Sequence, residues 1–146
     1  MSEPQPYRFN ISLRFSHPEA DLSVCSEEFG LAPIRQWIKG HARASPRGES
    51  LIGTWRDSYW TANIESSSHE DLETALAETI DLLSAHAEFL ASHLASNGSA
   101  SLFIGFFLEQ FNSGFTLEPT LQSKFASLGV SLEFDIYGSI DTPDAP

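Results

Sequence analysis

The stretch Ser101-Leu-Phe-Ile-Gly-Phe-Phe-Leu108 carries no charge and is apolar at nearly every position. Because successive side chains of a strand point to opposite faces, Phe103, Gly105 and Phe107 share one face, and the leucines and Ile104 share the other. A strand that is apolar on both faces is usually interior in its sheet and covered on both sides. The stretch therefore predicts a central strand over 100–108. Gly105 marks either a close approach to the backbone or room for a neighbouring aromatic ring.

Periodicity and turn residues predict the remaining elements around this strand. Residues 7–15 alternate between apolar and polar side chains, which is typical of a half-buried strand. Apolar residues at steps of three and four predict one continuous helix from about residue 67 to residue 97. Ser67 with Glu70, or Ser68 with Asp71, would form its capping box. The other expected elements are a short helix over 19–29, a weak strand over 34–39, a basic irregular loop over 40–53, a strand over 54–65, a short helix before Gly129 and a strand over 130–137.

The order of these elements is β-α-β-β-α-β-α-β, which indicates the α+β class. Its first six elements match the ferredoxin-like β-α-β-β-α-β pattern, with an α-β unit appended. We expect the helices mainly on one face of a largely antiparallel sheet. The length of 146 residues fits a single domain over 1–146, with an ordered core over about 7–138.

Composition and charge exclude several classes of protein. The chain is 41% hydrophobic, which is enough for a core, and its formal net charge is −12. An acidic surface repels phosphate backbones, so we expect no nucleic-acid partner. We expect no membrane association, because no apolar run approaches the ~20 residues of a membrane span. The N-terminus lacks the pattern of a secretory signal, and the one cysteine suits a reducing compartment, so we expect a cytoplasmic protein.

The charge is unevenly distributed along the chain. Residues 34–60 hold five basic and two acidic side chains, a local sum of +3, whereas residues 61–111 hold eight carboxylates and no lysine or arginine. All three tryptophans lie in the basic segment, and arginine beside aromatic rings is typical of binding hot spots. The candidate binding residues of this segment are Arg43, Arg47, Trp55, Arg56, Tyr59 and Trp60. The alternative is that the tryptophans are packing residues and the arginines are solvated.

A second candidate surface is the sheet face away from the helices. There the alternation collects Asn10, Ser12 and Glu133 with six candidate binding residues. These six are Arg8, Arg14, Phe103, Phe107, Asp135 and Tyr137. Exposed phenylalanines favour a ligand, a partner or a second copy of the chain on this face. The alternative is an ordinary exposed sheet with cross-strand ion pairs.

The sequence carries no recognised catalytic or cofactor motif. His86 and His93 are seven residues apart, but the usual local metal spacings are missing, so we expect no metal and no cofactor. Cys25 lies on the inward stripe of the first helix and fits a small core residue better than a nucleophile.

Several short motifs resemble those of a widespread bacterial family of small single-domain proteins, known only as a domain of unknown function. The motifs are Ala32-Pro33, Trp37-x-x-Gly40, Gly53-x-Trp55, Ser58-Tyr59-Trp60, Asn112-Ser113-Gly114-Phe115 and Asp135-Ile136-Tyr137-Gly138. The resemblance runs from about Tyr7 to Gly138. It implies a one-domain α+β protein and supplies no activity, substrate or catalytic residue.

Two functional hypotheses follow from the sequence. The first is a non-enzymatic protein-binding module, of the immunity or adaptor type, whose acidic surface masks a basic protein partner. The alternative is a domain that binds, or acts on, a small anionic ligand through the basic segment. A homodimer built on the uncovered sheet face is a third possibility.

Overall fold

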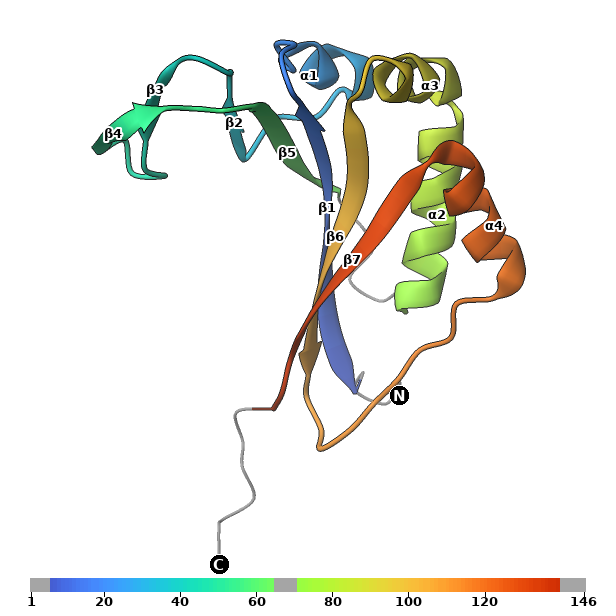
Figure 1. Cartoon of the computed structure of the whole chain (residues 1–146). Coiled ribbons are helices and arrows are strands. Elements are labelled where there is room, and N and C mark those ends of the chain that lie inside the picture. Colours follow the sequence, from blue (N-terminus) through green and yellow to red (C-terminus); the bar gives the residue numbers. More distant parts are fainter. Residues whose placement is uncertain (1–5, 65–70, 140–146) are drawn as a thin grey trace, which may run out of the picture.

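The computed structural model describes residues 6–64 and 71–139 and shows a sheet with helices packed beside it (Figure 1). The strands are β1 (Tyr7–His17), β2 (Arg35–Trp37), β3 (Ala42–Ala44), β4 (Ser50–Thr54), β5 (Ser58–Ile64), β6 (Ser99–Leu108) and β7 (Val130–Tyr137). The helices are α1 (Val24–Phe29), α2 (Leu72–Ser84), α3 (Ala87–Ala95) and α4 (Pro119–Leu128).

The main sheet has five strands in the order β2-β5-β1-β6-β7. The pairs β2–β5, β5–β1 and β1–β6 are antiparallel, and β6–β7 is parallel. The protein is thus a mixed α+β protein with a mostly antiparallel sheet, as the sequence predicts. The central strand is β1, and β6 is interior between β1 and β7.

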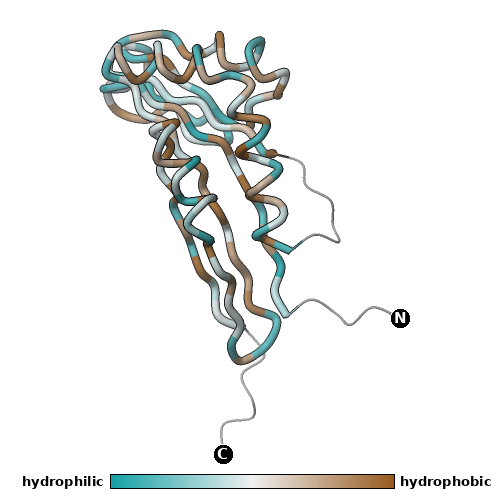
Figure 2. Tube along the Cα trace, turned by 90° about the vertical axis from the view of Figure 1, so that its right-hand side faces the viewer, coloured by the Kyte–Doolittle hydropathy of each residue, from teal (hydrophilic) through white to brown (hydrophobic). Residues whose placement is uncertain are grey.

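One face of this sheet carries the hydrophobic core. Along β1 the buried residues alternate with more exposed ones, and the alternation of hydropathy along the strands is visible in Figure 2. All four helices contribute to the same core, through residues such as Cys25, Leu76, Leu90 and Phe125. The helices therefore cover one face, and the opposite face, called the open face below, has no helix over it.

The expectation that the strand over 100–108 is covered on both sides is wrong. Its leucines and Ile104 face the core, but Phe103 and Phe107 lie half-buried on the open face. The guanidinium of Arg14 lies 3.8 Å from the ring centre of Phe103, so an arginine side chain covers this ring instead of a helix. A Cβ atom at Gly105 would lie 2.6 Å from Oδ1 of Asn10. Gly105 therefore makes room for that amide and for the adjacent ring of Phe107, which a Cβ atom would approach to 3.3 Å.

The single long helix expected over 67–97 is also wrong, because the chain turns between α2 and α3. His86 leaves the helical conformation, with φ −115° and ψ 28°. The turn lets α3 pack over one end of the sheet, where the rings of Phe89 and His93 lie edge-on to Phe15. Asp71 caps α2 by accepting a hydrogen bond from the backbone N–H of Thr74. The other residues of the expected capping box lie outside the described residues.

The segment expected as an irregular basic loop instead forms the hairpin β3–β4, and β5 begins only at Ser58. The hairpin is exposed along nearly its whole length, so it lacks the alternation of apolar residues that reveals a strand. Its turn contains Gly48, whose φ of +86° requires a residue without a side chain. The hairpin projects to the side of the sheet opposite α2 and α4 (Figure 1).

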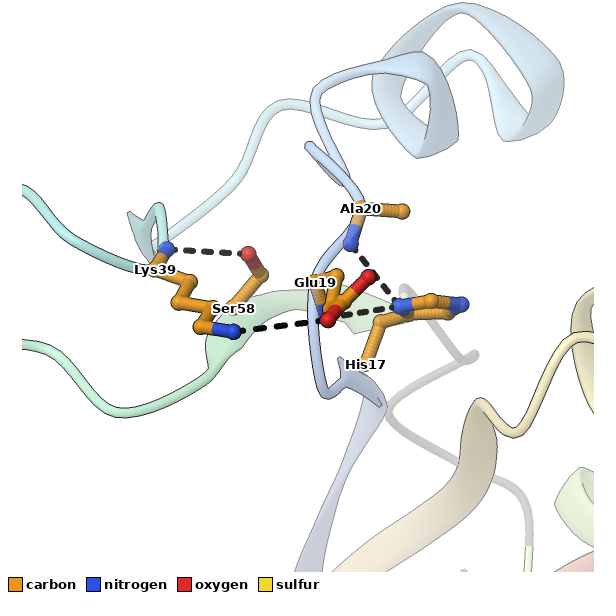
Figure 3. Close-up of polar contacts among 5 residues, drawn as sticks. All are labelled: His17, Glu19, Ala20, Lys39 and Ser58. Atoms are coloured by element: carbon orange, nitrogen blue, oxygen red, sulfur yellow. Dashed lines mark hydrogen bonds and ion pairs between the residues drawn. The ribbon is translucent and has the colours of Figure 1, made fainter.

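Polar contacts fix the base of this hairpin against the end of β1 (Figure 3). Nδ1 of His17 accepts hydrogen bonds from the backbone N–H groups of Glu19 and Ala20, at 2.9 and 2.8 Å. The side chain of Glu19 lies 3.5 Å from Nζ of Lys39, whose backbone N–H donates to Oγ of Ser58 at 3.0 Å. The strand β2 and the hairpin are thus tied to the turn that leaves β1.

Candidate binding site on the open sheet face

The register of the strands places two arginines on either side of one threonine. Thr61 of β5 pairs with Arg35 of β2 on one side and with Arg14 of β1 on the other. The next row toward the far end of β5 contains Asn63 and Ser12, and Oγ of Ser12 donates a hydrogen bond to Oδ1 of Asn63 at 3.1 Å. Because neighbouring strands lie about 4.8 Å apart, the two arginine backbones are about 10 Å from each other.

A cavity of about 410 Å³, called the open-face pocket below, lies over these rows. Four strands of the main sheet, β1, β2, β5 and β6, supply its walls. Its lining residues are Asn10, Ser12, Arg14, Ile34, Arg35, Trp37, Tyr59, Thr61, Asn63 and Phe103. This lining, within the part of the chain that the structure describes, contains cationic, amide, hydroxyl and aromatic groups but no carboxylate, histidine or cysteine.

Neither arginine of the pocket is neutralised by a carboxylate. Among residues 6–64 and 71–139, Arg14 and Arg35 form no ion pair. The guanidinium of Arg35 donates to the backbone carbonyl of Ala44 at 3.0 Å and lies 5.0 Å from the ring centre of Trp37. Arg14 is held by the ring of Phe103. Both positive charges are therefore fixed in position and remain available to an anionic group.

Two buried polar atoms in this site have no hydrogen-bond partner. They are Nε of Arg14 and Oγ1 of Thr61, and Thr61 is only 8% exposed. Buried polar groups in folded proteins are nearly always paired, and an unpaired one calls for an explanation such as an absent ligand or water. Both atoms belong to residues that line the open-face pocket.

Three aromatic rings form a stack beside the arginines. Trp37 is sandwiched between Trp55, at a ring-centre distance of 4.0 Å, and Tyr59, at 4.4 Å. The guanidinium of Arg43 lies 5.4 Å from the ring centre of Trp55, on the hairpin side of the stack. The stack joins the hairpin to the open face and gives the pocket a flat aromatic wall.

The candidate residues from the basic segment other than Trp60 therefore separate into three groups. Tyr59 lines the pocket, and Trp55 and Arg43 support the aromatic stack from the hairpin. Arg47 and Arg56 are exposed and do not line the pocket.

The assignment of Trp60 to a binding surface is wrong, because its side chain is fully buried. The alternation along β5 directs Trp60 to the core face, opposite to Tyr59. Its Nε1 donates a hydrogen bond to Oγ of Ser26 at 2.9 Å, and its ring lies against Phe15. Trp60 is a core residue.

The candidates on the open face likewise fall into two groups. Arg14 and Phe103 belong to the pocket, whereas Arg8, Phe107, Asp135 and Tyr137 lie toward the other end of the face. These four interact with one another or with neighbouring side chains.

At that end of the open face, Arg8 forms an ion pair with Glu109, and its guanidinium lies 5.4 Å from the ring centre of Phe107. The same ring stacks on Tyr137 at 4.8 Å. The hydroxyl of Tyr137 donates a hydrogen bond to Asp135, and this bond raises the pKa of the tyrosine. These contacts reduce the apolar area on which the homodimer hypothesis depends.

Seven pocket residues are not among the candidate binding residues: the alternation assigns Asn10 and Ser12 to this face, and the other five are Ile34, Arg35, Trp37, Thr61 and Asn63. A spacing of two residues relates Arg35 to Trp37, and Tyr59 to Thr61 and Asn63. This period could have placed them on one face once both short strands were recognised. Their position beside Arg14 depends on the order of the strands in the sheet, which the two-residue spacing does not predict.

The remaining reactive side chains lie away from the pocket. Burial raises the pKa of the Cys25 thiol to about 12, so this cysteine is a core residue. His93 is buried with Nε2 2.9 Å from the carbonyl oxygen of Ser99, and burial lowers its pKa. Within the described ranges, no three histidine, cysteine or acidic side chains gather as metal ligands do.

No described helix has both the length and the apolar character needed to cross a bilayer.

Comparison with known proteins identifies the family. No curated protein and no solved structure matched the chain in these comparisons. A family model, described as "Domain of unknown function (DUF4279)", matches residues 6–139, which include every element of the sheet and every residue of the open-face pocket. The chain therefore belongs to the DUF4279 family, as its short motifs indicate.

Proposed function

We propose that the protein is a binding module that holds a small anionic ligand in the open-face pocket. The observation that carries this proposal is the row Arg35–Thr61–Arg14, in which two arginines flank a buried hydroxyl, and none of the three side chains has an ion-pair or, for the hydroxyl, a hydrogen-bond partner among the described residues. A carboxylate or phosphate at Arg14 would pair with its charge and accept hydrogen bonds from Nε of Arg14 and Oγ1 of Thr61, and Arg35 would add positive potential to the same pocket.

The aromatic wall limits what the rest of the ligand is. Both faces of the Trp37 ring are covered, by Trp55 and Tyr59, so the half-buried ring of Tyr59 and the edge of Trp37 form the apolar surface beside the arginines. A planar or apolar group attached to the anion would bury area against these rings. The described lining offers no carboxylate, histidine or cysteine for acid–base or nucleophilic catalysis, so binding fits this pocket better than chemistry does.

Calorimetric titration and tryptophan fluorescence test the proposal. Phosphate, benzoate and 3-phenylpropanoate are titrated into the wild-type protein and into Arg14→Gln. The variant is expected to lose at least tenfold in affinity, because a charge-assisted contact contributes about 1.5–3 kcal/mol. Arg56→Gln is the matched control, since Arg56 is exposed and outside the pocket. A flat response to all three anions, or equal losses in both variants, contradicts the proposal.

The acidic helices support a second candidate function, the masking of a basic protein. Asp71, Asp81 and Glu88 are exposed on α2 and α3, and residues 61–111 contain no lysine or arginine. Their potential would attract and orient a basic partner, most strongly at low salt. The test is capture of a partner from native extract, followed by salt titration with the double variant Asp81→Asn/Glu88→Gln as the comparison. Capture that ignores both salt and the two substitutions rejects this candidate.

The proposal extends to the type of fold and to the cellular location of the protein. A ferredoxin-like core is supported by the antiparallel order β2-β5-β1-β6, to which β7 adds a parallel edge strand. Placement in the cytoplasm is supported by the lone buried cysteine, and cell fractionation with an antibody tests it.

A further inference from the structure

A second cavity adjoins the open-face pocket on the side of β7. Its volume is about 320 Å³, and it shares Arg14 and Tyr59 with the open-face pocket. The two cavities therefore adjoin each other at these residues, and together they are called the groove below. On its far side the second cavity is lined by Ser101, Ser131 and Glu133.

The groove holds both signs of charge. The parallel pairing of β6 with β7 places Glu133 directly beside Phe103, the ring that carries the guanidinium of Arg14. Glu133 is exposed, and within the described chain it has no ion-pair partner. The strand β6 separates β1 from β7, and Arg14 is level with Ser101 whereas Glu133 is level with Phe103, so the backbones of Arg14 and Glu133 lie about 12 Å apart. Opposite charges that face one groove without pairing leave room for a ligand between them.

We infer that the ligand of the open-face pocket is a zwitterion, a free amino acid or short peptide with its carboxylate at Arg14 and its ammonium group at Glu133. This inference rests on the proposed function and adds the second charge to it. Serine hydroxyls between the charged ends can accept hydrogen bonds from the ammonium group. An apolar side chain of the ligand would lie against Tyr59, which lines both cavities.

The net charge of the protein favours the same class of ligand. At −12 the molecule repels free anions at long range. A zwitterion has no net charge and does not meet this repulsion, yet it gains both local contacts once it is in the groove.

Three probes that share one ring test the inference by calorimetric titration. Phenylalanine carries both charges, 3-phenylpropanoate lacks the ammonium group, and phenethylamine lacks the carboxylate. Phenylalanine is expected to bind up to roughly fivefold more tightly than 3-phenylpropanoate, as for one exposed ion pair. Phenylalanylglycine, with its charges further apart, shows by its affinity relative to phenylalanine whether an amino acid or a peptide fits better, and tight binding of either supports the inference.

The variant Glu133→Gln identifies the origin of the preference. It is expected to reduce the ratio between phenylalanine and 3-phenylpropanoate to within roughly twofold while leaving 3-phenylpropanoate bound. Asp135→Asn is the matched control, because Asp135 is on the same face of β7 but bonds to Tyr137 outside the groove. This control should keep the preference of the wild-type protein.

The possible results distinguish a failure of the zwitterion inference from a failure of the proposed anion-binding function. Equal binding of phenylalanine and 3-phenylpropanoate, with both lost in Arg14→Gln, overturns the zwitterion and retains the anion site. A preference that survives Glu133→Gln also overturns it. Failure of every probe to bind overturns both the inference and the proposed function.

Discussion

Replacement of Thr61 by valine tests whether its unpaired hydroxyl marks a ligand site. Thr61 is 8% exposed, and its Oγ1 has no hydrogen-bond partner, so the folded protein has removed a polar group from water without compensation. A hydroxyl buried in this way costs about 1–3 kcal/mol on the scale of protein mutations. Valine has nearly the same shape and suits a strand. Thr61→Val is therefore expected to raise the free energy of unfolding by about 1 kcal/mol.

Thr79 is the matched control, because it is also a buried threonine, at 3% exposure. Its Oγ1 donates to the carbonyl oxygen of Ala75 at 2.7 Å. Thr79→Val removes a hydrogen bond that is made, and is expected to lower the free energy of unfolding by about 1 kcal/mol. The two variants should thus differ by about 2 kcal/mol, although the chemical change is the same.

Urea unfolding followed by circular dichroism measures both effects. With a slope near 2 kcal/mol per molar urea, the midpoints of the two variants should lie about 1 M apart, on opposite sides of the wild type. The stabilised Thr61→Val should also bind 3-phenylpropanoate roughly fivefold less tightly, through the loss of one hydrogen bond. If Thr61→Val is destabilised as much as Thr79→Val, the hydroxyl has a partner in the free protein, and it ceases to be evidence for a ligand.

Three further substitutions test the core and its titration. Ser26→Ala leaves the buried indole N–H of Trp60 without its acceptor and should lower the free energy of unfolding by about 1–2 kcal/mol, measured in urea. Burial lowers the pKa of His93 in the folded protein, so the unfolded chain takes up the proton first. Stability should therefore fall as the pH drops below the ordinary histidine pKa of about 6.5, until the lowered folded pKa is reached, and His93→Gln should flatten this part of the curve. Gly98→Ala places a Cβ atom against the imidazole of His93 and should cost about 1–3 kcal/mol in unfolding free energy, whereas Gly114→Ala meets no atom within 4 Å and should change stability by less than about 0.5 kcal/mol.

Each of these has a result that counts against it. For Ser26, the control is Ser23→Ala, since the N-cap side chain of Ser23 makes no capping hydrogen bond, and equal losses would show that the indole contact is not responsible. A pH dependence that is the same in His93→Gln would assign it to other groups. Equal stability of the two glycine variants would mean that the ring of His93 can move away freely.

The two-residue alternation of apolar and polar side chains along the strands is sufficient to predict which side chains occupy the open face. Strict alternation along β1 put Arg8, Asn10, Ser12 and Arg14 on one side, and the structure places them there. The same rule correctly assigned Phe103 and Phe107. These predictions hold because a strand has only two faces and the core needs one of them.

The periodicity of the sequence does not predict where a helix breaks or where an exposed hairpin forms. No proline or glycine stands at the helix break at His86, and the apolar pattern of the sequence continues across the break. The hairpin β3–β4 is exposed on both faces, so its sequence has no reason to alternate. Trp60 illustrates a third limit, because residue type suggested a binding aromatic while its position one residue from Tyr59 sends it into the core.

The appended strand β7 gives the groove its second charge. Without β7, the face beyond Arg14 would end at Ser101 and Phe103 of β6, with no carboxylate within reach. The register between β6 and β7 places Glu133 beside Phe103; a slip of one residue would turn Glu133 to the core face and bring Leu132 or Phe134 onto the open face. Such a slip would bury a charge and expose large apolar side chains, so the core that fixes Leu132 and Phe134 also fixes Glu133. The same packing that stabilises the edge of the sheet therefore positions the carboxylate of the proposed site.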